Sequence, residues 1–316
     1  MTKSLTIIQI IQKLCALGER QYAKENEARE IICGILKAND TNFRIQSFST
    51  FIPLAKKVEL LADGKIIPAI NTGFVSGSIN DNYSILSSLI SSQNNLYDSN
   101  INFNPRSDGI SRSNHYFAPS LAVSKHDLPI LLNAKKVQGQ TVVVKTKHES
   151  ANILVGNCKN PRSIVFCHYD SLDAGASDNA SGTALCLDLV IRNPKLLETT
   201  LVVFAGNEEL SYDEPVYWGH GYRVFERRFA PLLKEASQIL VLDSLGTGET
   251  ELSTNPKLTK LAFPLLHSDR YSHKIKVLCG EYDSLMPVYH SSLDTPKYLN
   301  DEYLKSAQQL LKQLLI

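Results

Sequence analysis

Residues 163–182 read SIVFCHYDSLDAGASDNASG, and this stretch begins the pattern that decides the fold. An apolar run from Ser163 to Cys167 comes first, and polar residues follow it directly. Near-continuous apolar runs of the same kind occur at 200–205, 239–242 and 275–278. Strands that are buried on both faces have such sequences. These runs therefore predict the central strands of one sheet.

Stretches with helical periodicity lie between the apolar runs, at 181–191, 221–236 and 257–266, and a last helix is expected from Asp301. One or two further helices are predicted within 5–38. Alternating strands and helices indicate an α/β fold. We expect a three-layer sandwich, in which a mixed, mostly parallel central sheet is flanked by helices.

The sequence between 52 and 138 predicts a smaller, β-rich insert. Just before this region, residues 43–48 alternate like a strand. Within it, apolar runs on both sides of Asp63-Gly64 indicate a hairpin. Further along, we expect a strand at 120–123 and a short helix at 128–134, and a strand at 141–145 follows the insert. The polar stretch 76–114 is typical of a surface excursion. The predicted organisation is a main domain of residues 1–51 and 139–316 with the insert 52–138.

Composition excludes several classes of protein. The chain has 316 residues, 43% hydrophobic and 21% charged, with 33 Lys and Arg against 32 Asp and Glu. We expect no nucleic-acid binding because there is no basic block. We expect no membrane span because no run approaches ~20 apolar residues, and residues 5–14 have the spacing of an amphipathic helix rather than of a signal peptide. Six cysteines without a C-x-x-C pair (Cys15, Cys33, Cys158, Cys167, Cys186, Cys279) favour a reducing, cytoplasmic setting.

Chemically useful side chains follow each of the predicted strands. In open α/β sheets, ligands bind outside the carboxyl ends of the strands. At those positions the sequence has only imidazole and carboxylate groups, and no thiol. Such a set is typical of a catalytic zinc, cobalt or manganese site and not of a closed structural zinc site. The candidates are His168, Asp170, Asp178, Glu208, Glu209, Asp243 and His290.

Each candidate also has an ordinary explanation when taken alone. His168 with Asp170 could be a surface pair, adjacent glutamates are usually solvated, and Asp243 could cap a helix. Their coincidence at successive strand ends favours a metal site. Two histidines and three carboxylates suffice for two metals if one carboxylate, most naturally Asp178, bridges them. One of the adjacent glutamates can then bind metal while the other acts as a base.

These motifs together resemble the co-catalytic di-zinc exopeptidase family. The resemblance rests on HYDS at 168–171, GASDNASG at 175–182, EE at 208–209, Asp243-x-x-Gly246 and YH-x-x-x-DT at 289–295. That family includes bacterial leucyl aminopeptidases and glutamate carboxypeptidase II and, more distantly, glutaminyl cyclases and the transferrin receptor. The resemblance covers 150–300 with ordered motifs and extends weakly to the first 40 residues. Residues 52–138 more loosely resemble the protease-associated insert of some members.

The resemblance implies a role for each candidate residue. It places His168 and Asp243 on one zinc and Glu209 and His290 on the other, with Asp178 bridging both. It assigns Glu208 as the general base that takes a proton from water. Asp170 matches the carboxylate that orients the His168 ring, a role that physical reasoning also supports. Two Zn²⁺ ions are implied, with Co²⁺ or Mn²⁺ as alternatives, and a cis peptide bond is implied after Asp178.

The implied activity is that of an aminopeptidase acting on peptide or aminoacyl substrates, in a chain that could form homo-oligomers. Ser171 and Ser181 are not expected to be nucleophiles because no G-x-S-x-G motif surrounds them. One alternative is a glutaminyl cyclase with a single zinc, although Asn179 favours the peptidase. Another is a non-catalytic binding protein, which the complete set of ligand positions opposes. The stretch 210–223, with Trp218, departs from the family pattern, and we expect it to form a pocket wall or to serve packing.

Overall fold

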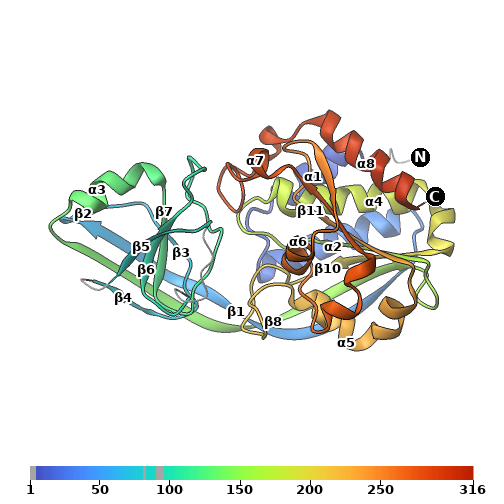
Figure 1. The fold of residues 1–316 in the computed structure, drawn as a ribbon, viewed down its shortest axis with the longest axis horizontal. Helices are drawn as coiled ribbons and strands as arrows, with labels where there is room; N and C mark the ends of the chain where they lie inside the picture. Colours follow the sequence, from blue (N-terminus) through green and yellow to red (C-terminus); the bar gives the residue numbers. More distant parts are fainter. Residues whose placement is uncertain (1–4, 81–82, 90–95, 316) are drawn as a thin grey trace. The chain divides into compact units, whose positions relative to one another are not determined.

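A computed structural model describes residues 5–80, 83–89 and 96–315. Parts of the polar excursion expected at 76–114, namely 81–82 and 90–95, lie outside the described residues. The chain divides into two compact units, which Figure 1 shows in ribbon form. Unit 1 comprises Met1–Thr50, His148–Leu285 and Asp294–Ile316, and unit 2 comprises Phe51–Lys147 and Met286–Leu293.

A mixed sheet forms the centre of unit 1. Its parallel strands are β9 (Ser163–His168), β10 (Thr200–Ala205), β11 (Gln238–Asp243) and β13 (Ile275–Gly280), and these contain the four apolar runs of the sequence. The strands β8 (Val137–Gly156) and β12 (Thr250–Ser253) pair with it in antiparallel fashion. The strand order is β12-β13-β11-β9-β10-β8-β1-β2, in which β1 spans Phe43–Ala62.

Helices cover both faces of this sheet, so the predicted three-layer α/β sandwich is confirmed. Along β9, Val165 and Cys167 belong to one core, whereas Ile164 and Phe166 belong to the other. The first core lies under the helices α1 (Ile7–Cys15), α2 (Ala23–Ala38), α4 (Gly182–Arg192) and α8 (Asp301–Leu315). The second lies under α5 (His220–Glu235) and residues 262–275. Burial on both faces explains why the strands lack an apolar–polar alternation.

Local sequence signals set several element boundaries. Helix α1 begins with a capping box, in which the Thr6 side chain accepts from the Gln9 N–H at 3.3 Å and Gln9 Oε1 accepts from the Thr6 N–H at 2.9 Å. The helix predicted at 257–266 is too long, since α6 (Pro256–Ala262) ends four residues earlier. The reason is Pro264, which disfavours helical backbone at the residue before it. Short helical elements are α7 (Tyr282–Leu285), η2 (Lys125–Asp127), η4 (Pro194–Glu198), η5 (Ser268–Arg270), η6 (Ser272–Lys274) and η7 (Pro296–Tyr298).

Unit 2 is rich in β-structure. The hairpin predicted at Asp63-Gly64 joins β1 to β2 (Lys65–Ile66), with Leu61 opposite Ile66. A second sheet has the order β3-β7-β6-β5, and a small core includes Leu60, Ile101 and Leu121. The remaining elements are β3 (Ile70–Asn71), β4 (Gly77–Ile79), β5 (Ser84–Ser87), β6 (Asn100–Phe103), β7 (Ser120–Val123) and α3 (Leu128–Asn133). The resemblance of this region to a protease-associated domain stays a prediction.

Apolar helices of the kind that cross bilayers are missing from the part of the chain that the structure describes. No helix there is both long enough and apolar enough to span a membrane.

The two-sided core of unit 1 predicts unequal effects of two leucine substitutions. Leu233 in α5 is fully buried, whereas Leu261 in α6 is 57% exposed. We expect Leu233→Ala to lower the free energy of unfolding by about 2–5 kcal/mol, because it leaves a cavity in the core. The control Leu261→Ala should cost less than about 0.5 kcal/mol. Urea unfolding of both variants measures this, and equal losses would contradict the assigned packing.

Candidate metal centre

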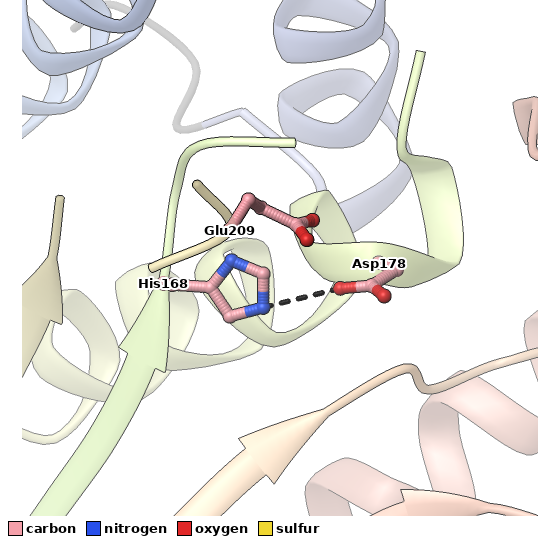
Figure 2. A group of neighbouring side chains, drawn as sticks. All are labelled: His168, Asp178 and Glu209. Carbon is pink, nitrogen blue, oxygen red and sulfur yellow. Dashed lines mark ion pairs between the residues drawn. The ribbon is translucent and has the colours of Figure 1, made fainter. Parts of the chain in front are cut away.

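His168, Asp178 and Glu209 come together at the carboxyl edge of the sheet (Figure 2). One potential ligand atom from each lies within 4.8 Å of the others, and all three side chains are buried. His168 is the last residue of β9, Asp178 lies in the turn η3 (Ala176–Ser181), and Glu209 follows β10. The Nε2 atom of His168 is 3.1 Å from Oδ1 of Asp178. The structure thus joins three of the residues that the sequence selected.

Asp243 extends this group from the next strand. It ends β11, and its Oδ1 lies 3.9 Å from His168 Nε2. The Ser244 hydroxyl donates to the same oxygen at 2.9 Å. The side chain of Asp243 is 21% exposed, against 1% for His168 and 5% for Asp178. Solvent therefore reaches the group from the side of Asp243.

Asp170 connects the ends of two neighbouring strands beneath these residues. Its Oδ1 accepts from the Glu208 N–H at 3.0 Å and its Oδ2 from the Glu209 N–H at 2.9 Å. The His168 ring lies beside it, with Nδ1 3.5 Å from Oδ1 and 3.2 Å from the Asp170 carbonyl oxygen. Burial acts to raise the pKa of the Asp170 carboxyl, but the His168 ring and the two N–H groups hold that pKa below its ordinary value. Asp170 is therefore charged, and it fixes both the imidazole and the glutamate loop.

The pKa of Glu208 is shifted in the opposite direction to that of Asp170. Its side chain is only 7% exposed, and burial raises its pKa well above the ordinary value. The nearby carboxyl groups of Glu209, Asp170 and Asp243 raise it further, while His168 opposes them. A carboxyl group with a raised pKa can take up a proton readily, as general bases must do.

The turn that carries Asp178 is held by a residue far along the chain. Asp294 accepts from the Ser177 N–H at 2.7 Å and from the Asp178 N–H at 3.0 Å. The peptide bond between Asp178 and Asn179 is cis, as the resemblance implied. Burial raises the pKa of Asp294 to about 7. Asp294 belongs to the motif at 289–295, but the sequence alone did not show that it positions Asp178.

Arg20 is a second supporting residue to which the sequence analysis gave no role. Its guanidinium is fully buried and donates to the carbonyl oxygens of Tyr169 at 2.7 Å, Ala174 at 2.5 Å and Gly175 at 3.0 Å. These carbonyl groups lie in the loop between His168 and Asp178. Arg20 therefore fixes the spacing of two candidate ligands without touching either of them.

A buried ionic cluster lies below the loop that carries the two glutamates. Glu25 of α2 is fully buried, and its Oε2 lies 2.6 Å from His148 Nε2. Ser150 also donates to Glu25. A Cβ atom at Gly206 would lie 2.5 Å from Ser150 Oγ and 2.6 Å from Glu25 Oε1, so only glycine fits there. One sequence signal could have revealed this cluster, since Glu25 falls on the apolar face that continues through Ala28 and Ile32.

His290 belongs to unit 2, unlike the other candidates. Within that unit its carbonyl oxygen accepts from the Arg112 N–H at 2.8 Å, and its ring stacks on Tyr289 with centroids 3.8 Å apart. Its assignment as a metal ligand stays a prediction.

The stretch 210–223 is ordered by a buried arginine. Arg223 is fully buried and donates to the carbonyl oxygens of Trp218 at 2.5 Å and Val216 at 2.9 Å. The indole N–H of Trp218 donates to the Leu261 carbonyl at 2.9 Å. Packing thus accounts for part of this stretch, and its role as a substrate pocket wall stays a prediction.

Comparison with known families bears on the region that holds these residues. Residues 142–261 match the sequence model of peptidase family M28. The M28-like segment includes all the candidates except His290, and it also excludes Arg20, Glu25 and Asp294. No curated protein matches the chain significantly.

Solved structures show the same fold. A zinc aminopeptidase from Bacillus subtilis aligns with a TM-score of 0.70 and 17% identity, over 98% of this chain and 94% of the other. An aminopeptidase from an Aneurinibacillus strain aligns with a TM-score of 0.61 and 16% identity, over 96% and 90%. The glutaminyl cyclase of Porphyromonas gingivalis aligns with a TM-score of 0.54 and 12% identity, over 98% and 96%. At these identities the likeness establishes the fold alone.

The buried cluster below the glutamate loop predicts a large difference between two glutamates of the same helix. Glu25 pairs with His148 in the interior, whereas Glu27 pairs with Lys24 on the surface, where its side chain is 46% exposed. We expect Glu25→Ala to lower the free energy of unfolding by about 3–5 kcal/mol, because His148 loses its buried partner. The control Glu27→Ala should cost less than about 1 kcal/mol. Denaturant unfolding tests this, and a Glu25→Ala variant as stable as Glu27→Ala would refute a structural role for the cluster.

Proposed function

We propose that this protein is a metal-dependent peptidase of the M28 type that removes amino-terminal residues from peptides. The observation that carries the proposal is the convergence of His168, Asp178 and Glu209, three buried potential ligands within 4.8 Å of one another. The M28 match over 142–261 and the fold shared with zinc aminopeptidases support it.

The donor set fits divalent zinc. Zinc in catalytic sites takes imidazole nitrogen and carboxylate oxygen, and this group offers both without a thiolate. Several carboxyl groups are buried around one imidazole, and buried charges of one sign need compensation by a cation or a proton. We propose that His168 and Asp243 would hold one ion and Glu209 a second, and that Asp178 would be available to both.

The side chains around the group supply the remaining chemistry. Bound zinc provides Lewis-acid chemistry, since it acidifies water and polarises a peptide carbonyl. Glu208 accepts the proton of the attacking water at its carboxylate and donates it to the leaving amine. Asp170 holds the Glu208 and Glu209 backbone through their N–H groups and so keeps the base at a constant position. No side-chain nucleophile is needed.

The choice of an aminopeptidase over a cyclase rests on residue chemistry. Glutaminyl cyclases share the fold, so the fold does not separate the two activities. In the cyclase pattern a serine follows the residue that corresponds to Asp178, whereas this chain has Asn179. Asn179 is buried, donates to the Leu242 carbonyl at 2.8 Å and accepts from the Gly182 N–H at 3.0 Å.

A substitution at the proposed base should separate catalysis from metal binding. We expect Glu208→Gln to retain its metal but to lose about 10²–10⁴-fold in kcat, because an amide cannot accept the proton. Glu251→Gln, at an exposed glutamate of β12, is the matched control and should keep full activity. Substantial turnover by Glu208→Gln would remove Glu208 from this role.

A substitution at a proposed ligand should affect metal binding itself. We expect Glu209→Ala to bind less zinc per chain and to lose activity, because one of the converging ligand atoms is gone. Elemental analysis after gel filtration measures the zinc content, with Glu251→Ala as the control. A fully loaded and active Glu209→Ala variant would contradict ligation.

The activity itself is tested with three substrate classes, namely aminoacyl, N-acyl-aminoacyl and N-terminal glutaminyl compounds. About two zinc ions per chain, with aminoacyl release that a chelator abolishes, would support the proposal. One zinc ion with cyclisation of glutaminyl substrates would establish the cyclase in its place. Failure to bind metal or to turn over any substrate would identify a binding protein on this scaffold.

A further inference from the structure

An open cavity of about 470 Å³ lies at the surface of unit 1, between the first residues of β1, the end of β8 and helix α5, and its three arginines are exposed. Its volume falls in the range of about 300–1,000 Å³ that is typical of small-molecule sites. All of its lining residues belong to unit 1. None of the chemistry described above uses this cavity.

The charge of the cavity lining is entirely positive. Arg44, Arg227 and Arg228 line it, and no aspartate or glutamate does. Among the described residues, no carboxylate forms an ion pair with any of these three guanidinium groups, whereas Arg192 of α4, on the other face of the sheet, is paired with Asp188. The chain as a whole carries a net charge of only +1. The three guanidinium groups thus form a local excess of positive charge without an internal partner.

The rest of the lining is largely apolar. Leu154 is 2% exposed, and Val224 and Phe229 are half-buried. Helix α5 breaks at this point, since Phe229 has non-helical angles (φ −126°, ψ 28°) and Pro231 follows. Proline cannot donate a backbone hydrogen bond to the carbonyl group of Arg227, four residues earlier. The break gives the cavity an aromatic wall beside its two neighbouring arginines.

The cavity and the candidate metal centre share no residue. His168 lies opposite Ala205, at the carboxyl end of β10, whereas Gly156 of β8 lies opposite Leu201, near its amino end. Cys158, two residues after Gly156, therefore lies toward the amino ends of the parallel strands, whereas Leu154 lies opposite Val203 in the middle of β10. Helix α5 starts beside the loop that carries the glutamates, since the Gly221 N–H donates to the carbonyl of Asn207 at 3.3 Å. Arg227 and Arg228 are about two turns further along.

We propose that this cavity binds a small organic anion with an apolar body, such as a medium-chain carboxylate. Guanidinium groups bind carboxylates through paired, charge-assisted hydrogen bonds. The apolar wall would remove the hydrocarbon part of the ligand from water. The volume suits a single small molecule rather than a segment of a polymer. This proposal does not depend on the peptidase activity.

Calorimetric titration of the full chain tests the ligand class. The probe is decanoate, compared with decan-1-ol, which lacks the charge, and with inorganic phosphate, which lacks the apolar body. We expect decanoate to bind saturably and the other two to bind at least about tenfold more weakly. Decan-1-ol cannot form charge-assisted hydrogen bonds with the guanidinium groups, and phosphate has no apolar part to bury. Absence of saturable decanoate binding up to about 5 mM, or equal binding of decan-1-ol, would overturn the proposal.

A pair of double variants tests the location. Arg227→Ala with Arg228→Ala should weaken decanoate binding by about tenfold or more, since two charge-assisted contacts are lost. Arg162→Ala with Arg270→Ala changes the net charge equally at exposed positions outside the cavity, and should leave binding unchanged. Circular dichroism checks that both are folded. Equal effects of the two pairs would show that the binding reflects net charge and not this cavity.

A thiol in the cavity gives a second, independent readout. Cys158 lines the cavity, and Cys33 of α2, which is buried to a similar degree, does not. We expect saturating decanoate to slow alkylation of Cys158 by N-ethylmaleimide by about fivefold or more, as peptide mass spectrometry measures it, and to leave Cys33 unaffected. Unchanged alkylation of Cys158 at saturation would refute binding in the cavity.

Discussion

The arrangement of the candidate site depends on one buried carboxylate. Asp170 follows β9, and its two oxygens accept from the N–H groups of Glu208 and Glu209, which follow β10. A fully buried carboxylate is stable only when hydrogen bonds and nearby positive groups compensate its charge. That requirement keeps the ends of the two strands together. The imidazole of His168 and both glutamates therefore occupy fixed positions at the edge of the sheet.

Residues from outside the M28-like segment complete this support. Arg20 precedes α2 and holds the carbonyl groups of the loop between His168 and Asp178. Asp294 comes from the last part of the chain and holds the turn of Asp178. Glu25 lies under Gly206 in a fully buried cluster. Each satisfies polar groups that would otherwise be buried without partners, so the geometry of the site is coupled to the stability of the whole unit.

Two regions of unit 1 have opposite charge. Carboxylates dominate the edge where the parallel strands end, and guanidinium groups line the cavity beside the first residues of β1 and the last residues of β8. Helix α5 contributes to both regions, because it starts beside the glutamate loop and breaks at Phe229 beside the cavity. A single helix thus connects the proposed metal chemistry to the proposed anion site.

The sequence by itself determined the layers of the fold and the candidate ligands. Doubly buried strands require continuous apolar runs, and the carboxyl ends of parallel strands meet at one edge, so His168, Asp178, Glu209 and Asp243 could be chosen from order alone. Only the tertiary structure decided which residues hold them. The contacts of Arg20, Glu25 and Asp294 join positions more than 100 residues apart, and most of them involve backbone groups, which every residue carries and no side-chain pattern reveals. The end of α6 was also mispredicted from the sequence, because Pro264 ends the helix although the apolar pattern continues.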